Sequence, residues 1–183
     1  MTRVIVVFFV MVFAAGTVQA QHLQPYAGLQ ARSLKALSDE QVADLKAGRG
    51  MGLALAAELN GYPGPRHVLE LAQELNLTAP QRLRTQQLYD AMTAEAVPLG
   101  EQLIAAETDL DRQFSDRTIT PASLTAVSVE IGAMQGQLRA AHLKYHLAMM
   151  DVLTPEQIAR YAKLRGYGNA PAGHSPALHN HKK

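Results

Sequence analysis

The pentapeptide Leu77-Thr78-Ala79-Pro80-Gln81 returns later in the chain as Leu153-Thr154-Pro155-Glu156-Gln157. In both copies a Thr precedes a Gln by three positions, which is the spacing of a capping box: the Thr side chain accepts from the Gln backbone N–H, and the Gln side chain accepts from the Thr backbone N–H. A looser third copy reads Leu37-Ser38-Asp39-Glu40-Gln41. Each copy predicts the start of a helix. Capping alone does not explain the recurring Gln, because Glu would cap equally well.

The repeated pattern resembles the LTxxQ signature of the periplasmic Spy/CpxP-type proteins, which are small all-helical chaperones and stress- or metal-response factors. The resemblance covers about residues 38–166 and is carried by Leu77, Thr78, Gln81, Leu153, Thr154 and Gln157. It implies an ATP-independent chaperone that binds unfolded or partly folded envelope proteins during stress, works as an antiparallel homodimer and requires no cofactor. Better-known members have a basic surface, from which this nearly neutral chain departs.

The first twenty residues have the features of an export signal. Arg3 provides a positive start, residues 4–13 are apolar but too few to span a membrane, and Val18-Gln19-Ala20 provides a cleavage site. We therefore expect a periplasmic protein that begins near Gln21 and has no membrane span after cleavage. The alternative is an uncleaved membrane anchor.

The composition narrows the possible functions. The 183 residues include no Cys, which excludes thiol chemistry and disulfides. Without Arg3 the formal charge of +1 falls to about zero, which argues against a nucleic-acid partner. No Glu-x-x-His motif, nucleophile elbow or zinc-protease motif occurs, so we expect no enzyme.

The apolar spacing predicts two long helices, from Thr78 towards Phe114 and from Thr120 to about Val152, whose heptad seams match. We therefore expect an all-α fold: an elongated helical hairpin, bent at Pro98 and preceded by short helices over residues 39–47, 53–59 and 66–76. A close helix contact is expected at Gly132 and Gly136. Residues 155–165 should be helical, residues 21–37 mobile and residues 167–183 disordered.

Residues 143–153 are apolar on nearly every side of the expected helix, so something should cover them. One possible cover is the set of short N-terminal helices. The other is a partner, either a second protomer or an unfolded client. The candidates for this client or dimer surface are Leu143, Leu147, Met149 and Met150.

His142 and His146 lie one turn apart, and Met150 follows one turn later. Two imidazoles and a thioether could hold zinc or copper, which suggests a metal-binding sensor or resistance protein as a second function. The alternative is that both imidazoles simply flank the apolar seam. Metal could also bind weakly to His174, His179 and His181, and His67 with Glu70 is either half a metal site or a surface pair. A third possible function is an accessory regulator that binds the periplasmic domain of a two-component sensor kinase.

Overall fold

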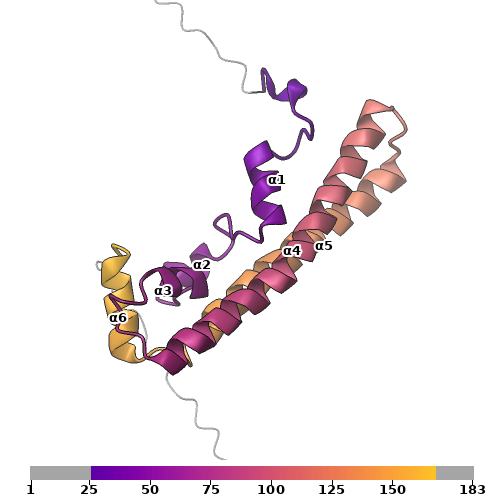
Figure 1. Cartoon of the computed structure of the whole chain (residues 1–183). Helices are drawn as coiled ribbons and strands as arrows, with labels where there is room; N and C mark the ends of the chain where they lie inside the picture. Colours follow the sequence, from indigo (N-terminus) through magenta and orange to yellow (C-terminus); the bar gives the residue numbers. More distant parts are fainter. Residues whose placement is uncertain (1–25, 168–183) are drawn as a thin grey trace, which may run out of the picture.

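The computed structural model describes residues 26–167, and all regular structure in that range is helical (Figure 1). Helices α4 (Ala79–Ser115) and α5 (Pro121–Met149) pack along each other as an antiparallel hairpin. At 1.5 Å per residue, the 37 residues of α4 extend over about 55 Å. The predicted elongated all-α hairpin is thus confirmed, and α4 continues without a break through Pro98. Among the described residues, no helix is long and apolar enough to cross a membrane. The predicted signal peptide and His-containing tail lie outside this range.

Shorter elements flank the hairpin. A 3-10 turn, η1 (Leu29–Ala31), and helices α1 (Asp39–Lys46), α2 (Leu55–Glu58) and α3 (Pro65–Glu70) precede it. Helix α6 (Pro155–Leu164) follows it and stands at the end away from the α4–α5 turn (Figure 1). Helix α1 packs on α4, α2 packs on α5, and α3 touches both. Helix α3 is shorter than expected, because it ends at Glu70 and turns follow over residues 71–76. The last of these residues, Asn76, has a left-handed φ of 50°.

Capping explains where the main helices begin. Complete capping boxes at Ser38, Thr78, Thr120 and Thr154 open α1, α4, α5 and α6, as the sequence predicts for the three Gln-containing copies. In the box at Thr120 the residue three positions on is Ser123. A capping box in this chain therefore does not require Gln.

Buried apolar side chains form two groups. The hairpin cluster contains Leu45, Ala96, Leu103, Ala106, Val127, Ile131 and Leu138. The motif-end cluster contains Val68, Leu75, Leu88, Met149, Leu153 and Tyr161. The predicted heptad seam supplies most of the hairpin cluster, which confirms that α4 and α5 face each other along it.

The close helix contact lies at a different glycine from those predicted. A Cβ added at Gly132 or Gly136 would meet nothing within 4 Å, so the contact expected there is wrong for this chain. Both glycines line the cleft between α5 and the residues around α1. A Cβ at Gly100 would instead lie 2.5 Å from the carbonyl oxygen of Leu45. Glycine at position 100 therefore allows the backbone of α1 to approach α4.

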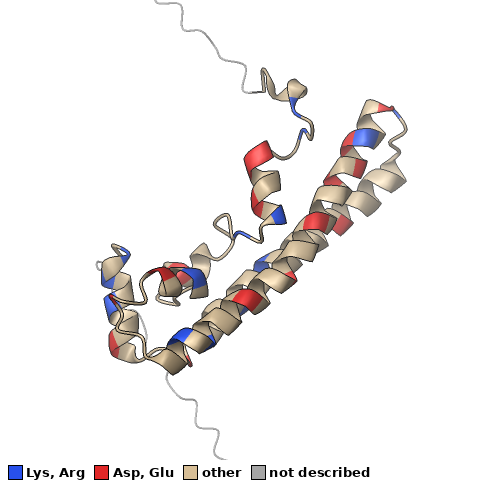
Figure 2. Ribbon diagram, viewed as in Figure 1, with Lys and Arg blue, Asp and Glu red and all other residues tan. Residues whose placement is uncertain are grey.

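Charges are distributed unevenly along the hairpin (Figure 2). Acidic side chains predominate in the half nearer the α4–α5 turn, namely Glu101, Glu107, Asp109, Asp111, Asp116 and Glu130, against Arg112 and Arg117. At the opposite end of the hairpin and on α6 the two signs are closer to balance, with Arg82, Arg84, Arg139, Lys144, Arg160, Lys163 and Arg165 against Asp90, Glu95, Asp151 and Glu156, and α2 and the residues from α3 to α4 add Glu58, Glu70 and Glu74 against Arg66. The rod therefore has an acidic end at the α4–α5 turn and a nearly neutral end at the paired motifs.

Candidate functional site

The two pentapeptides meet through their Gln side chains. Gln81 Nε2 donates to Gln157 Oε1 at 2.8 Å, and Gln157 Nε2 donates to Gln81 Oε1 at 3.1 Å. Each amide also donates to a backbone carbonyl, Gln81 to Val152 at 2.9 Å and Gln157 to Leu75 at 3.2 Å. A carboxylate has no N–H to donate. This is the physical reason for Gln at both positions, beyond its part in the capping box.

The Leu residues of the motif support the same junction. Leu153 is buried in the motif-end cluster, and Leu77 packs against that cluster while half-buried. The first turns of α4 and α6 are therefore joined by a polar pair and by apolar contacts. The two motif copies therefore meet at one end of the hairpin.

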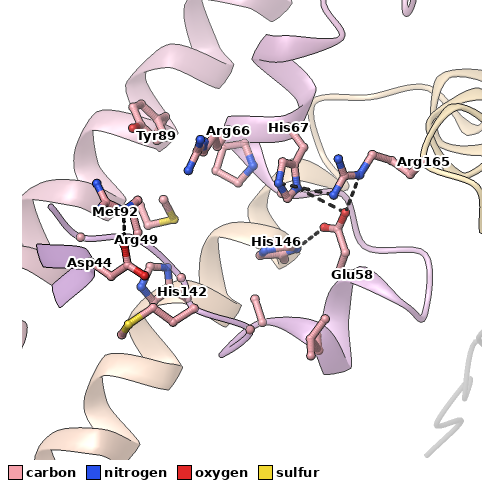
Figure 3. Close-up of a pocket in the computed structure, with 18 of the residues that line it drawn as sticks. Asp44, Arg49, Glu58, Arg66, His67, Tyr89, Met92, His142, His146 and Arg165 are labelled. Atoms are coloured by element: carbon pink, nitrogen blue, oxygen red, sulfur yellow. Dashed lines mark hydrogen bonds and ion pairs between the residues drawn. The ribbon is translucent and has the colours of Figure 1, made fainter. Parts of the chain in front are cut away.

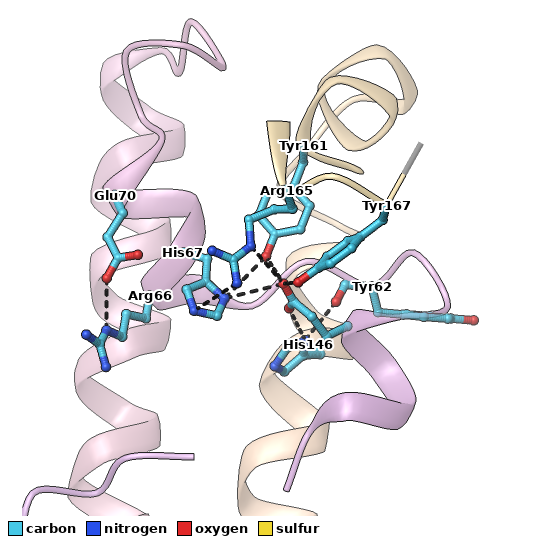
Figure 4. A network of polar contacts seen from close by, with 9 residues as sticks. Tyr62, Arg66, His67, Glu70, His146, Tyr161, Arg165 and Tyr167 are labelled. Carbon is cyan, nitrogen blue, oxygen red and sulfur yellow. Dashed lines mark hydrogen bonds and ion pairs between the residues drawn. The ribbon is translucent and has the colours of Figure 1, made fainter. Parts of the chain in front are cut away.

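A second polar site surrounds the buried carboxylate of Glu58 in α2. Figure 4 shows His67, Tyr161, Arg165 and Tyr167, which converge on this site. The Glu58 side chain accepts hydrogen bonds from the hydroxyl groups of Tyr161 and, at 3.2 Å, Tyr167. Its Oε1 also lies 3.5 Å from Arg165 Nε and 3.4 Å from His67 Nδ1. One acidic side chain thus connects α2 to α3, α6 and the residues that follow α6.

The surroundings of Glu58 keep it ionised. Burial acts to raise its pKa, but the hydrogen bonds from His67 and Tyr161, together with electrostatic attraction to His67 and His146, outweigh burial and lower the pKa to about 2. Burial and the carboxylate of Glu58 in turn raise the pKa of Tyr161. The site therefore contains a carboxylate that bears a charge at neutral pH next to a phenol that stays protonated.

Glu58 also lines a cleft of about 380 Å³ between the hairpin and the chain that precedes it (Figure 3). His142 and His146 of α5 lie in its wall and are 2% and 6% exposed. His146 Nδ1 is 2.7 Å from the carbonyl oxygen of Tyr62, which can only accept, so Nδ1 carries a proton and donates to it. Burial and the neighbouring His146 lower the pKa of His142, whose Nε2 is buried without a hydrogen-bond partner.

The remaining predicted site residues have different environments. Leu147 is exposed, whereas Leu143 and Met150 are half-buried. Met149 is fully buried in the motif-end cluster, so its assignment to an exposed client or dimer surface is wrong. The cover over the histidines comes from the N-terminal segment, because α2 packs on α5 and its Glu58 faces His146.

Two residue groupings that the sequence suggested, His67 with Glu70 and Met150 with the histidines of α5, are not found in the structure. Glu70 pairs with Arg66 at 2.9 Å, while His67 turns towards Glu58. The cleft that holds His142 and His146 is lined by Met51 and Met92, and Met150 is not among its lining residues. Among the described residues, no three His, Cys, Asp or Glu side chains are grouped so that they could hold a metal ion. A metal here would therefore need thioether ligands.

Sequence reasoning missed Glu58, Tyr161, Arg165 and Tyr167. The sequence indicates Glu58 only weakly, as the single acidic residue in the otherwise apolar run Leu55-Ala56-Ala57-Glu58-Leu59. A charged side chain on such a short helix must reach solvent or find buried partners. Its partners come from more than a hundred residues later in the chain, so no local pattern indicates them.

The helical hairpin and the joined motif copies define an all-helical LTxxQ-type protein. The family model described as LTXXQ motif family protein matches residues 64–165. The match covers more than half of the chain, which therefore belongs to the LTXXQ motif family. Neither the curated proteins nor the solved structures contain a match to it. The family match begins at Gly64, so α1, α2 and the loop between them lie outside it.

Proposed function

We propose that this protein is an ATP-independent chaperone of the periplasm that binds non-native envelope proteins and suppresses their aggregation. Membership of the LTXXQ motif family supports the proposal, and the observation that carries it is the surface of the hairpin. Large apolar side chains are exposed along its whole length, namely Leu83, Phe114, Leu124, Val129 and Leu147. Dispersed apolar contacts of this kind favour loose binding of many different chains over tight binding of one.

The outer face of α5 strengthens the argument. Only Glu130, Arg139 and Lys144 carry a full charge among its 29 residues. Ala, Ser and Val fill many of the remaining exposed positions. A solvated helix usually bears charges on that face. A weakly polar face on a long rod suits a client that must remain able to fold while bound.

The double variant Val129→Lys/Leu147→Lys tests this surface. Full burial of a Val or Leu side chain is worth about 1.5–3 kcal/mol, so losing two partial contacts should weaken client binding by about tenfold. The measurement is light scattering by an aggregating unfolded client at increasing chaperone concentrations. Ser128→Lys, at an exposed position beside Val129, is the matched control for added charge. Equal protection by all three proteins, or none by the wild type, would contradict the proposal.

A metal-binding function is the second candidate, because the cleft places imidazole and thioether ligands together. The lowered pKa of His142 favours its neutral, metal-binding form, and His146 lies in the wall of the same cleft. Met51 and Met92 line the same cleft, and in Figure 3 Met92 lies on the same side as His142. Two imidazoles with thioethers form a soft ligand set that suits Cu(I) better than Zn(II).

Calorimetric titration with Cu(I), and separately with Zn(II), tests this second function. We expect the heat of Cu(I) binding to disappear in His142→Ala and to fall in Met92→Leu. Met134→Leu is the matched control, because Met134 packs against the hairpin cluster and does not line the cleft. Unchanged heats in His142→Ala would assign binding to other histidines, and no heat in the wild type would remove this function.

A further inference from the structure

The two apolar clusters differ in how they depend on the chain before Gly64. The motif-end cluster is built from residues 68–161, all of which lie inside the family match. The hairpin cluster is completed from outside that match by buried Leu45, against which Leu37 and Leu53 add partly buried contacts. The motif end can therefore keep its core if the N-terminal part of the chain moves away.

The N-terminal arm, defined as residues 26–47, consists of short elements. Its helices are the three residues of η1 and the eight residues of α1. Helices of fewer than about 12 residues are marginal in water, so the arm owes its order to contacts with α4. These contacts are incomplete, since clefts of about 380 Å³ and 480 Å³ lie between the hairpin and the residues around the arm. Such a cover is held less firmly than a close-packed core.

The chain between α1 and α2 has the backbone of a hinge. Gly48, Met51 and Gly52 have φ values of 63°, 42° and 81°. A left-handed Met is uncommon because its Cβ crowds the backbone, and strain of this kind is typical of segments that switch conformation. Beyond this hinge, Glu58 keeps α2 attached to α6. The arm can therefore lift while α2 stays in place.

We infer that the N-terminal arm is a removable cover, and that the face of the hairpin beneath it binds leucine-bearing segments of non-native polypeptides. The inference rests on the proposed chaperone function and names the surface where that function is exerted. The arm itself shows what this face accepts. Buried Leu45 reaches the hairpin cluster from the short helix α1, whereas Leu37 and, after the hinge, Leu53 reach it from irregular backbone, and Lys35 adds an ion pair with Asp111. Spaced leucines on short or irregular segments are also what an unfolded protein presents.

The variant Gly100→Ala, which adds one methyl group where α1 meets α4, tests the inference. In Gly100→Ala the new Cβ would lie 2.5 Å from the carbonyl oxygen of Leu45, and because that atom belongs to the backbone, α1 must move away. Ser128→Ala is the control, since it places an alanine at an exposed position of the other long helix that lines neither cleft. Leu45→Ala weakens the same contact from the side of the arm. Limited trypsin cleavage at Arg32, Lys35 and Lys46 reports arm release independently of chaperone activity.

We expect Gly100→Ala and Leu45→Ala to open the arm roughly tenfold more often, which increases apparent client affinity by up to the same factor. Both variants should be cleaved faster in the arm and should suppress aggregation at lower concentrations, while Ser128→Ala behaves as wild type. Faster cleavage with unchanged or weaker protection would overturn the inference. Unchanged cleavage in both variants would also overturn it, because the arm would then not be separately displaceable.

A reversible disulfide that holds the arm closed is the converse test. A Cβ at Gly48 would lie 3.6 Å from that of Ala96, which is within the range for a disulfide, and the chain has no other Cys. We expect oxidised Gly48→Cys/Ala96→Cys, which holds the arm on α4, to lose protection and to regain it on reduction. Equal protection in both forms would overturn the inference alone. Absence of protection in the wild type and the reduced variant would instead contradict the proposed chaperone function.

Discussion

The Gln157→Glu variant is expected to unfold with a free energy about 2–3 kcal/mol lower than the wild type, even though Glu still caps α6. The carboxylate can accept the hydrogen bonds from Thr154 N and Gln81 Nε2, as Gln157 Oε1 does. It cannot donate to the carbonyl of Leu75 or to Gln81 Oε1. It also brings a negative charge against two oxygen acceptors. The loss therefore measures the junction between the two motif copies, separately from helix capping.

Gln41→Glu is the matched control for this change. Gln41 makes the same capping box with Ser38 but has no hydrogen bond across the fold. Its replacement should change the free energy of unfolding by less than about 0.5 kcal/mol, as for most surface substitutions. Urea unfolding of the three proteins, followed by far-UV circular dichroism, makes the comparison. Similar losses in both variants would mean that Gln acts only as a capping residue.

Glu58→Gln should destabilise the fold by about 3 kcal/mol at pH 7, because it removes the counter-charge of Arg165 from a buried site. Gln keeps the shape and one acceptor oxygen, so the variant isolates the charge. Glu70→Gln breaks the exposed Arg66–Glu70 pair and serves as control, with an expected loss of at most about 1 kcal/mol. Equal stabilities of Glu58→Gln and wild type would show that the buried charge contributes nothing net.

The same variant should alter the dependence of stability on pH. The folded-state pKa of Glu58 is about 2, below its ordinary value of 4.5, so its contribution is complete above pH 4.5 and is lost as the pH falls towards 2. Wild type should lose about 3 kcal/mol from this group across that window, and Glu58→Gln should lack this part of the decline. Unfolding measured between pH 2 and 7 tests the sign. Parallel curves for the two proteins would contradict the assignment.

The sequence sufficed to predict the features that depend on local spacing. Capping boxes lie within four residues and heptads within seven, so the starts of α1, α4 and α6 and the facing of α4 and α5 could be read directly. Periodicity does not show which small residue touches another helix. Gly132 and Gly136 matched the expected spacing, yet Gly100 makes the contact, because the packing of α1 on α4 determines the site.

The polar site was less predictable. The question of why Gln recurs could be posed from the sequence, but its answer needed the position of α6 against α4. Glu58 gave only a weak signal, and the histidines were identified without the methionines that line their cleft. Such sites are assembled from segments far apart in the chain, so a pattern can supply the residue types and leave their partners undefined.

The excess of acidic side chains around the α4–α5 turn gives that end of the rod a negative potential, whereas the end with the paired motifs is nearly neutral (Figure 2). Basic segments of a polypeptide approaching from solution are therefore drawn towards the turn before any contact forms. With a Debye length of about 8 Å at physiological salt, this steering acts only over the last approach, and added salt weakens it further.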